Sequence, residues 1–230
     1  MAKPQRTKAL ESFEVNIRRP RALLDMFDAG SLKPEAGDRR TVGKPSWQEN
    51  ELLRAAVIVA VGTLDAYLSD VAAEILVAQL QRGWDVRASA EAREQGRLVL
   101  RRVIKEIDTL PLELALLSDP ADRASAAAEA IRHYLDNQVS NHGAKGVAAT
   151  LGRIGAEIDW QVLDARVPEA ARRSTDKQGA AAALDAWTKR RHELVHQGKA
   201  LKIKAGEARA VTDLVEIIAR QVDALAIATK

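Results

Sequence analysis

The chain has 230 residues, a mass of 25.0 kDa, a net charge of +3 and a pI of about 9.2. It contains no cysteine, which excludes disulfides, thiolate metal sites and cysteine nucleophiles. The excess of positive charge is too small to predict nucleic-acid binding by itself. Hydrophobic residues make up 47% of the chain but aromatic residues only 3%, so the core must consist mainly of small aliphatic side chains. This composition favours an all-α fold.

The composition and the N-terminal residues predict a cytoplasmic protein without membrane contact. The first residues lead into an amphipathic segment and not into an apolar stretch, so we expect no signal peptide. The longest apolar run, Ala55 to Val61, is far shorter than the roughly 18 residues that a membrane span requires.

Helical periodicity begins close to the N-terminus. Apolar residues keep helical spacing from about residue 7 to 28, and Pro20 lies inside this pattern. We therefore predict a helix over 7–28 that is kinked or broken near the proline. Residues 29–46 are rich in glycine, proline and charged residues and are predicted to form a loop.

A long central helix is predicted to begin after Ser46. Ser46 and Glu49 have the spacing of a capping box, and no proline interrupts the chain until Gly83, a residue suited to follow a helix end. The stretch 55–68 is apolar nearly all round, which predicts burial on several sides. Asp65 lies inside it and must find donors, because an unpaired buried charge is too costly. Asp65 either forms a salt bridge that only holds helices together or orients the arginine or histidine of the C-terminal motif.

The middle of the chain is predicted to form shorter helices. Helices are predicted from Ser89 to about residue 108 and over 121–137, followed by a break at 141–146. Residues 147–165 are predicted to form two short helices divided near Gly155, and the polar stretch 166–176 is the best candidate for a mobile segment. We expect 84–170 to be an irregular insert in a single all-α domain spanning 1–230, a bundle of five or more helices.

Two helices are predicted at the C-terminus. The first is expected to direct Leu184, Trp187, Leu194 and Val195 toward the core and to end at Gly198. The second, over about 207–229, is amphipathic and should pack back onto the bundle. Its apolar face carries Val211, Leu214, Val215, Ile218, Val222 and Leu225.

Two histidines and an arginine pair gather at residues 190–198, and one interpretation of this stretch is a zinc peptidase. His192 and His196 would lie on one helix face, with Glu193 as the general base for a metal-bound water. Glu216, 20 residues on, is a candidate third ligand. Against this interpretation, Arg191 directly precedes the motif, the helix is expected to end just after it, and no strand is predicted to line a substrate cleft.

The same stretch also resembles the signature of HEPN-domain ribonucleases, in which an arginine is followed by a polar residue and then a histidine. Arg191, His192 and His196 match that order with a spacing of R-x4-H. Residues 10–13, the central helix and the amphipathic helix after the motif also resemble the RiboL-PSP type. The resemblance is weakest over 84–140.

The resemblance implies a role for each matching residue. Arg191 would bind the phosphate and His196 would act as general acid or base, while His192 occupies the polar position where the family prefers Asn. Asp65 lies where the family often has a carboxylate on the central helix. Arg190 also satisfies the loose spacing, but His192 in the polar position favours Arg191.

The implied activity is metal-independent RNA cleavage that leaves a 2′,3′-cyclic phosphate, without a cofactor. On an ideal helix Arg191 and His196 lie about 140° apart, so one helix does not easily bring both to one phosphate. The resemblance implies a homodimer whose motifs face each other, a role as toxin or antiphage-defence effector, and an antitoxin or activator protein as partner. The alternative is a non-catalytic HEPN-like module that binds nucleotide or RNA or serves dimerisation.

Overall fold

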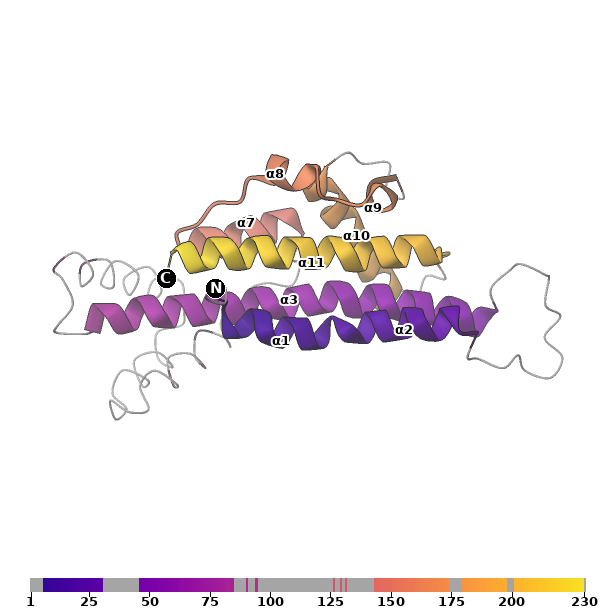
Figure 1. The fold of residues 1–230 in the computed structure, drawn as a ribbon, viewed down its shortest axis with the longest axis horizontal. Coiled ribbons are helices and arrows are strands. Elements are labelled where there is room, and N and C mark those ends of the chain that lie inside the picture. Colours follow the sequence, from indigo (N-terminus) through magenta and orange to yellow (C-terminus); the bar gives the residue numbers. More distant parts are fainter. Residues whose placement is uncertain are drawn as a thin grey trace, which may run out of the picture.

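The computed structural model describes residues 6–30, 46–84, 143–173, 179–197 and 201–229, and single helical residues between 90 and 131 (Figure 1). No strand occurs within these ranges, and the prediction of an all-α bundle of five or more helices is confirmed. Apart from those single helical residues, the helices predicted at 89–108 and 121–137 lie outside the described residues, as does most of the loop predicted at 29–46. The described helices are α1 (Lys8–Asn16), α2 (Arg18–Asp28), α3 (Trp47–Trp84), α7 (Ala144–Arg153), α8 (Trp160–Asp164), α9 (Glu169–Arg173), α10 (Ala180–His196) and α11 (Ala205–Ala228).

The predicted break in the first helix is present. It lies at Ile17, between α1 and α2, and Pro20 is the third residue of α2. Proline has no N–H to donate to the carbonyl of Asn16, and its ring crowds that carbonyl, so the helix is interrupted three residues earlier. The side chain of Thr7 caps α1 by accepting a hydrogen bond from the N–H of Leu10 at 3.0 Å.

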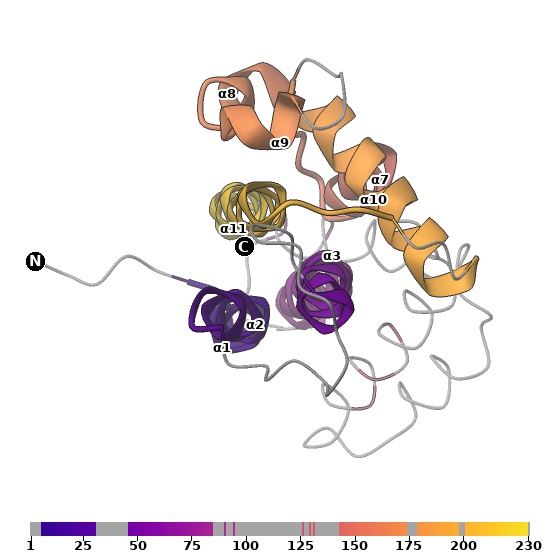
Figure 2. The same ribbon diagram turned by 90° about the vertical axis from the view of Figure 1, so that its right-hand side faces the viewer.

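Helix α3 begins with the predicted capping box. The N–H of Glu49 donates to Ser46 Oγ at 3.1 Å, and the N–H of Ser46 donates to Glu49 Oε2 at 2.7 Å. The helix continues to Trp84, slightly past the predicted end at Arg82–Gly83. Figure 2 shows α3 end-on between the α1–α2 pair, α11 and α10. It is therefore the central helix of the bundle, as its apolar composition predicts.

The most extensive packing is that of α11 against α3. Alanines on both helices, such as Ala56, Ala60, Ala208 and Ala219, are fully buried, so the two backbones approach closely. The hydroxyl of Tyr67 on α3 donates to the carbonyl of Ala219 on α11 at 3.0 Å. Small side chains thus form much of the interface between these two helices, in a chain that contains few aromatic residues.

By length and composition alone, α3 could cross a membrane. The qualifying helix runs from Trp47 to Arg82, and half of its most apolar window is buried inside the bundle. The core helix of a soluble protein passes the same test. Cytoplasmic localisation therefore stays a prediction.

A second layer, formed by α7, α8, α9 and α10, covers α11 and one side of α3 (Figures 1 and 2). The split near Gly155 is present, and this glycine has a positive φ of 81°. Helix α7, however, begins at Ala144, where the sequence predicted a break through residue 146. The prediction is wrong because Asp185 of α10 accepts the N–H of Ala144 at 2.7 Å and caps the helix from outside its own segment.

The segment predicted to be mobile, 166–176, is partly helical. Within it α9 (Glu169–Arg173) packs on α11 and α10, and Val167 and Ala171 are buried. Two apolar residues in a polar stretch are sufficient to attach it to the core. Its last residues, from 174 on, lie outside the described part of the chain.

Candidate functional site

The strongest link between the motif and the core is an ion pair between α10 and α3. Arg191 Nη1 lies 2.5 Å from Asp65 Oδ2, and the side chains are 31% and 17% exposed. Arg191 Nε is buried and has no hydrogen-bond partner in the part of the chain that the structure describes. Asp65 therefore meets the motif arginine, as its functional interpretation requires. The alternative, a salt bridge that only holds helices together, is equally consistent with this contact, so the role of Asp65 stays a prediction.

Helix α3 makes room for this arginine with a glycine. A Cβ placed on Gly62 would lie 3.6 Å from Arg191 Nη2 and 4.0 Å from Nε, so a larger side chain would reach the guanidinium. A glycine inside a helix costs about 1 kcal/mol relative to alanine, which makes it a signal of close approach. Sequence reasoning missed Gly62, although its isolated position in an apolar helix was visible.

The two motif histidines lie on one face of α10, as their spacing of four predicts. The ring centroids of His192 and His196 are 4.6 Å apart and the rings are tilted by 43°. Both side chains are exposed. His196 is the last residue of α10, and its neighbour Gln197 closes the helix by donating its N–H to the carbonyl of Glu193. The histidines are thus accessible, whereas Arg191 is directed onto α3.

Arg190 is directed differently from Arg191. Its guanidinium carbon lies 4.7 Å from the ring centroid of Trp187, a cation–π arrangement. Trp187 is fully buried and donates from its ring N–H to the carbonyl of Ala171 at 3.4 Å. Arg190 therefore covers a core aromatic, and the geometry distinguishes it from the arginine that meets Asp65.

One residue of the motif helix lies where the sequence did not predict it. Val195 is 47% exposed, although it was expected to face the core, while Leu194 does pack against the core. Consecutive residues on a helix point about 100° apart, so both cannot lie on the stripe that contains Trp187. The exposed face of α10 near the motif consequently carries an apolar side chain beside the histidines.

The chain after the motif is attached to α3 as well. Arg54 Nε donates to the carbonyl of Leu201 at 2.9 Å, and the same guanidinium pairs with Glu51. Two arginine contacts, at Arg54 and Arg191, thus hold the end of α10 and the start of the next segment against one helix.

The structure does not assemble the zinc site. Glu216, the candidate third ligand, lies on α11 and pairs with Arg21 and Arg220. Among the described residues, no three His, Asp or Glu side chains gather closely enough to hold a metal ion. His192, Glu193 and His196 are therefore not joined by a third protein ligand from the described part of the chain.

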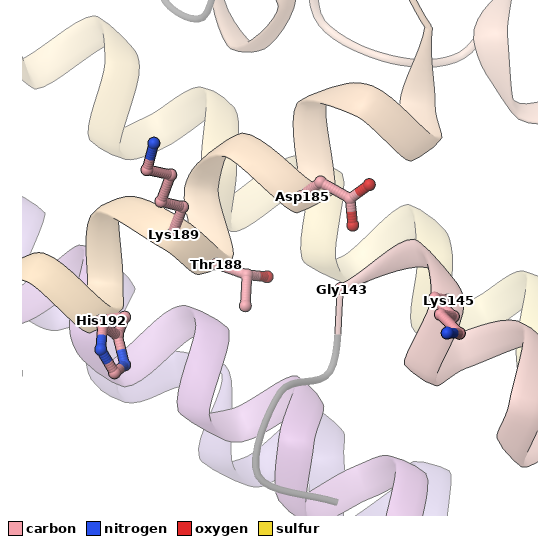
Figure 3. A pocket seen from close by; sticks show the side chains of 6 residues that line it. All are labelled: Gly143, Lys145, Asp185, Thr188, Lys189 and His192. Carbon is pink, nitrogen blue, oxygen red and sulfur yellow. The ribbon is translucent and has the colours of Figure 1, made fainter.

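A pocket of about 380 Å³ lies beside the motif, between α10 and the start of α7 (Figure 3). We call it the α7–α10 pocket. Its lining comprises Gly143, Lys145, Asp185, Thr188, Lys189 and His192. Because His192 belongs to both the pocket and the motif, the two form one continuous surface. The sequence did not reveal this pocket, since its residues come from segments about 40 positions apart.

Comparison of the chain with protein-family models, with curated proteins and with solved structures finds no match. The similarity to HEPN ribonucleases therefore depends on the residues of the motif and on the order of the helices alone.

Proposed function

We propose that this protein is a metal-independent endoribonuclease of HEPN type that acts as a homodimer. The observation that carries the proposal is the partly buried Arg191–Asp65 pair, which fixes a guanidinium against α3 on the same helix that carries two exposed histidines at its end. Arg191 Nε is also a buried donor without a hydrogen-bond partner among the described residues, so this guanidinium retains a donor for a further acceptor.

The chemistry follows from these residue types. The ribose 2′-oxygen attacks the adjacent phosphorus, a new O2′–P bond forms, and the P–O5′ bond breaks to leave a 2′,3′-cyclic phosphate. A histidine takes the proton from the 2′-hydroxyl and the leaving 5′-oxygen receives a proton from a histidine, and such a transfer contributes about 10²–10⁴-fold. Arg191 binds the phosphate oxygens as their charge grows in the transition state. In this scheme His196 moves the proton and His192 lies beside it, and no metal ion or cofactor is required.

The directions of the two side chains support the proposed homodimer. Arg191 is turned onto α3 while His196 is exposed at the helix end, so a second copy is needed to bring a histidine to the phosphate bound by the arginine. The exposed Val195 on the same helix end supplies apolar surface for such a contact. RNA is the substrate in this proposal. By resemblance, the biological role is that of a toxin or antiphage-defence effector controlled by an antitoxin or activator protein.

A second function has support from the same ion pair. Asp65 already neutralises Arg191, which suits a helix-packing role in a non-catalytic module that binds nucleotide or RNA or serves dimerisation. Such a module would bind without cleaving.

The test is cleavage of mixed-sequence RNA in excess EDTA, with analysis of the product ends. We expect wild type to leave cyclic phosphates and His196→Ala and Arg191→Ala to lose about 10²-fold or more of the rate. Glu193→Gln is the matched control, because it would inactivate a zinc hydrolase and leave this mechanism intact. Wild-type protein that binds RNA but never cleaves it would favour the non-catalytic module.

Mixing the two inactive variants tests the shared site. If each site combines Arg191 of one protomer with His196 of the other, half of the re-formed dimers are mixed and each has one intact site. The mixture should then recover about a quarter of wild-type activity. No recovery, in a mixture shown to exchange subunits, would reject the composite site.

A further inference from the structure

We infer that the α7–α10 pocket binds a phosphate of the RNA strand adjacent to the phosphate that is cleaved. This inference rests on the proposed function and deepens it by giving the substrate a second point of attachment. The pocket and the motif share His192, whose ring lies 4.6 Å from that of His196. A strand whose scissile phosphate lies at the motif therefore passes the pocket next.

The first argument is a buried hydroxyl. Thr188 is only 6% exposed, and its buried Oγ1 has no hydrogen-bond partner among the described residues. Figure 3 shows this oxygen directed from α10 toward the Gly143 side of the pocket. A buried hydroxyl without a partner costs about 1–3 kcal/mol, so a group that accepts its hydrogen bond would be favoured there.

The second argument is the start of α7, which lies opposite Thr188 in the pocket wall. Helix α7 has ten residues, and its first N–H, that of Ala144, is bonded to Asp185. The positive end of the helix dipole favours an anion there. Gly143 permits this arrangement, because a Cβ on it would lie 2.3 Å from the Asp185 carboxylate.

The third argument is charge. Lys145 comes from α7 and Lys189 from α10, and His192 adds a positive charge when protonated. Asp185 opposes them, so two lysines and one carboxylate leave a formal charge of +1 with His192 neutral. A single net positive charge with a hydroxyl donor suits one phosphodiester, which carries one negative charge.

Asp185 allows a specific test of the inference, because its hydrogen bond to α7 and its negative charge can be changed independently. Its oxygen accepts the N–H of Ala144, which an asparagine can also do, while its charge repels a phosphate. Asp185→Asn should therefore preserve α7 and tighten phosphate binding. A pocket that serves only to hold α7 against α10 would gain nothing from this change.

Thr188→Val distinguishes an effect on phosphate binding from an effect on stability. Valine has nearly the same shape and removes a hydroxyl that has no partner in the free protein, so the melting temperature should stay the same or rise. If the hydroxyl binds phosphate, the same substitution weakens binding. A loss of affinity without a loss of stability distinguishes a ligand-binding role from a structural one.

The experiment measures binding of a short, fluorescently labelled 2′-O-methyl oligonucleotide, which has no free 2′-hydroxyl and cannot be cleaved. We expect Lys145→Ala to weaken binding about tenfold and to reduce the salt dependence by about one ion, because one phosphate contact is lost. Thr188→Val should weaken binding by about threefold to tenfold, and Asp185→Asn should strengthen it by about twofold to threefold. Lys8→Ala is the matched control, since it removes the same charge from the exposed surface of α1.

Equal effects of Lys145→Ala and Lys8→Ala, or no gain in Asp185→Asn, would overturn the inference. So would an oligonucleotide that does not bind wild type at all. The proposed function is tested separately in the same preparations, through cleavage of unmodified RNA. Binding that follows the predicted pattern without cleavage would refute the ribonuclease alone, whereas cleavage with unchanged binding in all the pocket variants would refute the pocket alone.

Discussion

Asp65 and Asp223 lie on the two longest described helices, and the fold satisfies the two carboxylates in opposite ways. Asp223 on α11 is 4% exposed and accepts hydrogen bonds from the N–H and the hydroxyl of Thr7, both neutral donors. Asp65 on α3 instead meets the guanidinium of Arg191, close to the surface. The neutral arrangement fixes a structural junction at the start of α1. The charged one involves an arginine on the same helix as two exposed histidines, and the proposed chemistry depends on this second arrangement.

The largest expected effect is on the neutral junction. Asp223→Ala leaves the N–H and the hydroxyl of Thr7 buried without their acceptor, since Thr7 is fully buried. We expect a loss of about 3 kcal/mol in the free energy of unfolding, measured by urea denaturation. Asp223→Asn is the matched control, because its side-chain oxygen can still accept, and it should retain most of the stability. Equal losses in the two variants would show that the hydrogen bonds to Thr7 are not what stabilises the junction.

The charged pair should show a smaller but coupled effect. Arg191→Leu or Asp65→Leu should each cost about 2 kcal/mol, less than for a fully buried pair because the side chains are 31% and 17% exposed. The double variant should cost less than the sum, with a coupling energy of about 1 kcal/mol, because removing both partners leaves no unpaired charge. A double-mutant cycle by urea denaturation measures this coupling. Strict additivity would mean that the pair does not stabilise the fold.

The contribution of Asp223 to stability should also depend on pH. Burial raises the pKa of Asp223, although the hydrogen bonds from Thr7 lower it; Glu74 raises it further and Arg6 lowers it. The folded state therefore holds this proton more tightly than the unfolded state does. Between the ordinary pKa of an aspartate and the raised value, the free energy of unfolding should fall as pH rises.

The control for this pH dependence is Asp223→Asn, which cannot ionise. The free energy of unfolding of this variant, minus that of wild type, should increase with pH across the same window and then become constant. The measurement is a series of urea denaturation curves for both proteins at different pH. A difference that does not change with pH would contradict the raised pKa.

The smallest expected effect concerns the room that α3 leaves for Arg191. A Cβ at Gly62 would make ordinary van der Waals contact with the guanidinium at 3.6 Å, so Gly62→Ala should gain helix propensity and stabilise the protein by up to about 1 kcal/mol. RNA cleavage should be unchanged. Gly62→Val places a branched side chain against the guanidinium and should lower both the melting temperature and cleavage. If the alanine variant is destabilised, the close approach of Arg191 is tighter than this geometry indicates.

Local signals predicted much of the fold. The capping box at Ser46 and Glu49, the break before Pro20 and the apolar face of α11 each depend on residues within one or two helical turns, and each is present. Apart from Val195, whose exposure follows from the geometry of its own helix, the errors arose where a distant group intervened. Asp185 starts α7 earlier than its own sequence indicates, and α11 gives the polar segment around α9 a surface to pack on.

The sequence by itself determined which residue types stand together in the motif at the end of α10, because their spacing of one and four positions is a property of any helix. It also required that Asp65 find a donor, because an unpaired charge is not tolerated inside an apolar stretch. Only the tertiary structure decided that this donor is Arg191, 126 positions away, and that Thr188 and Lys145 share a pocket. Contacts between distant segments depend on how whole helices pack, and the periodicity of a single helix does not predict which other helices it contacts.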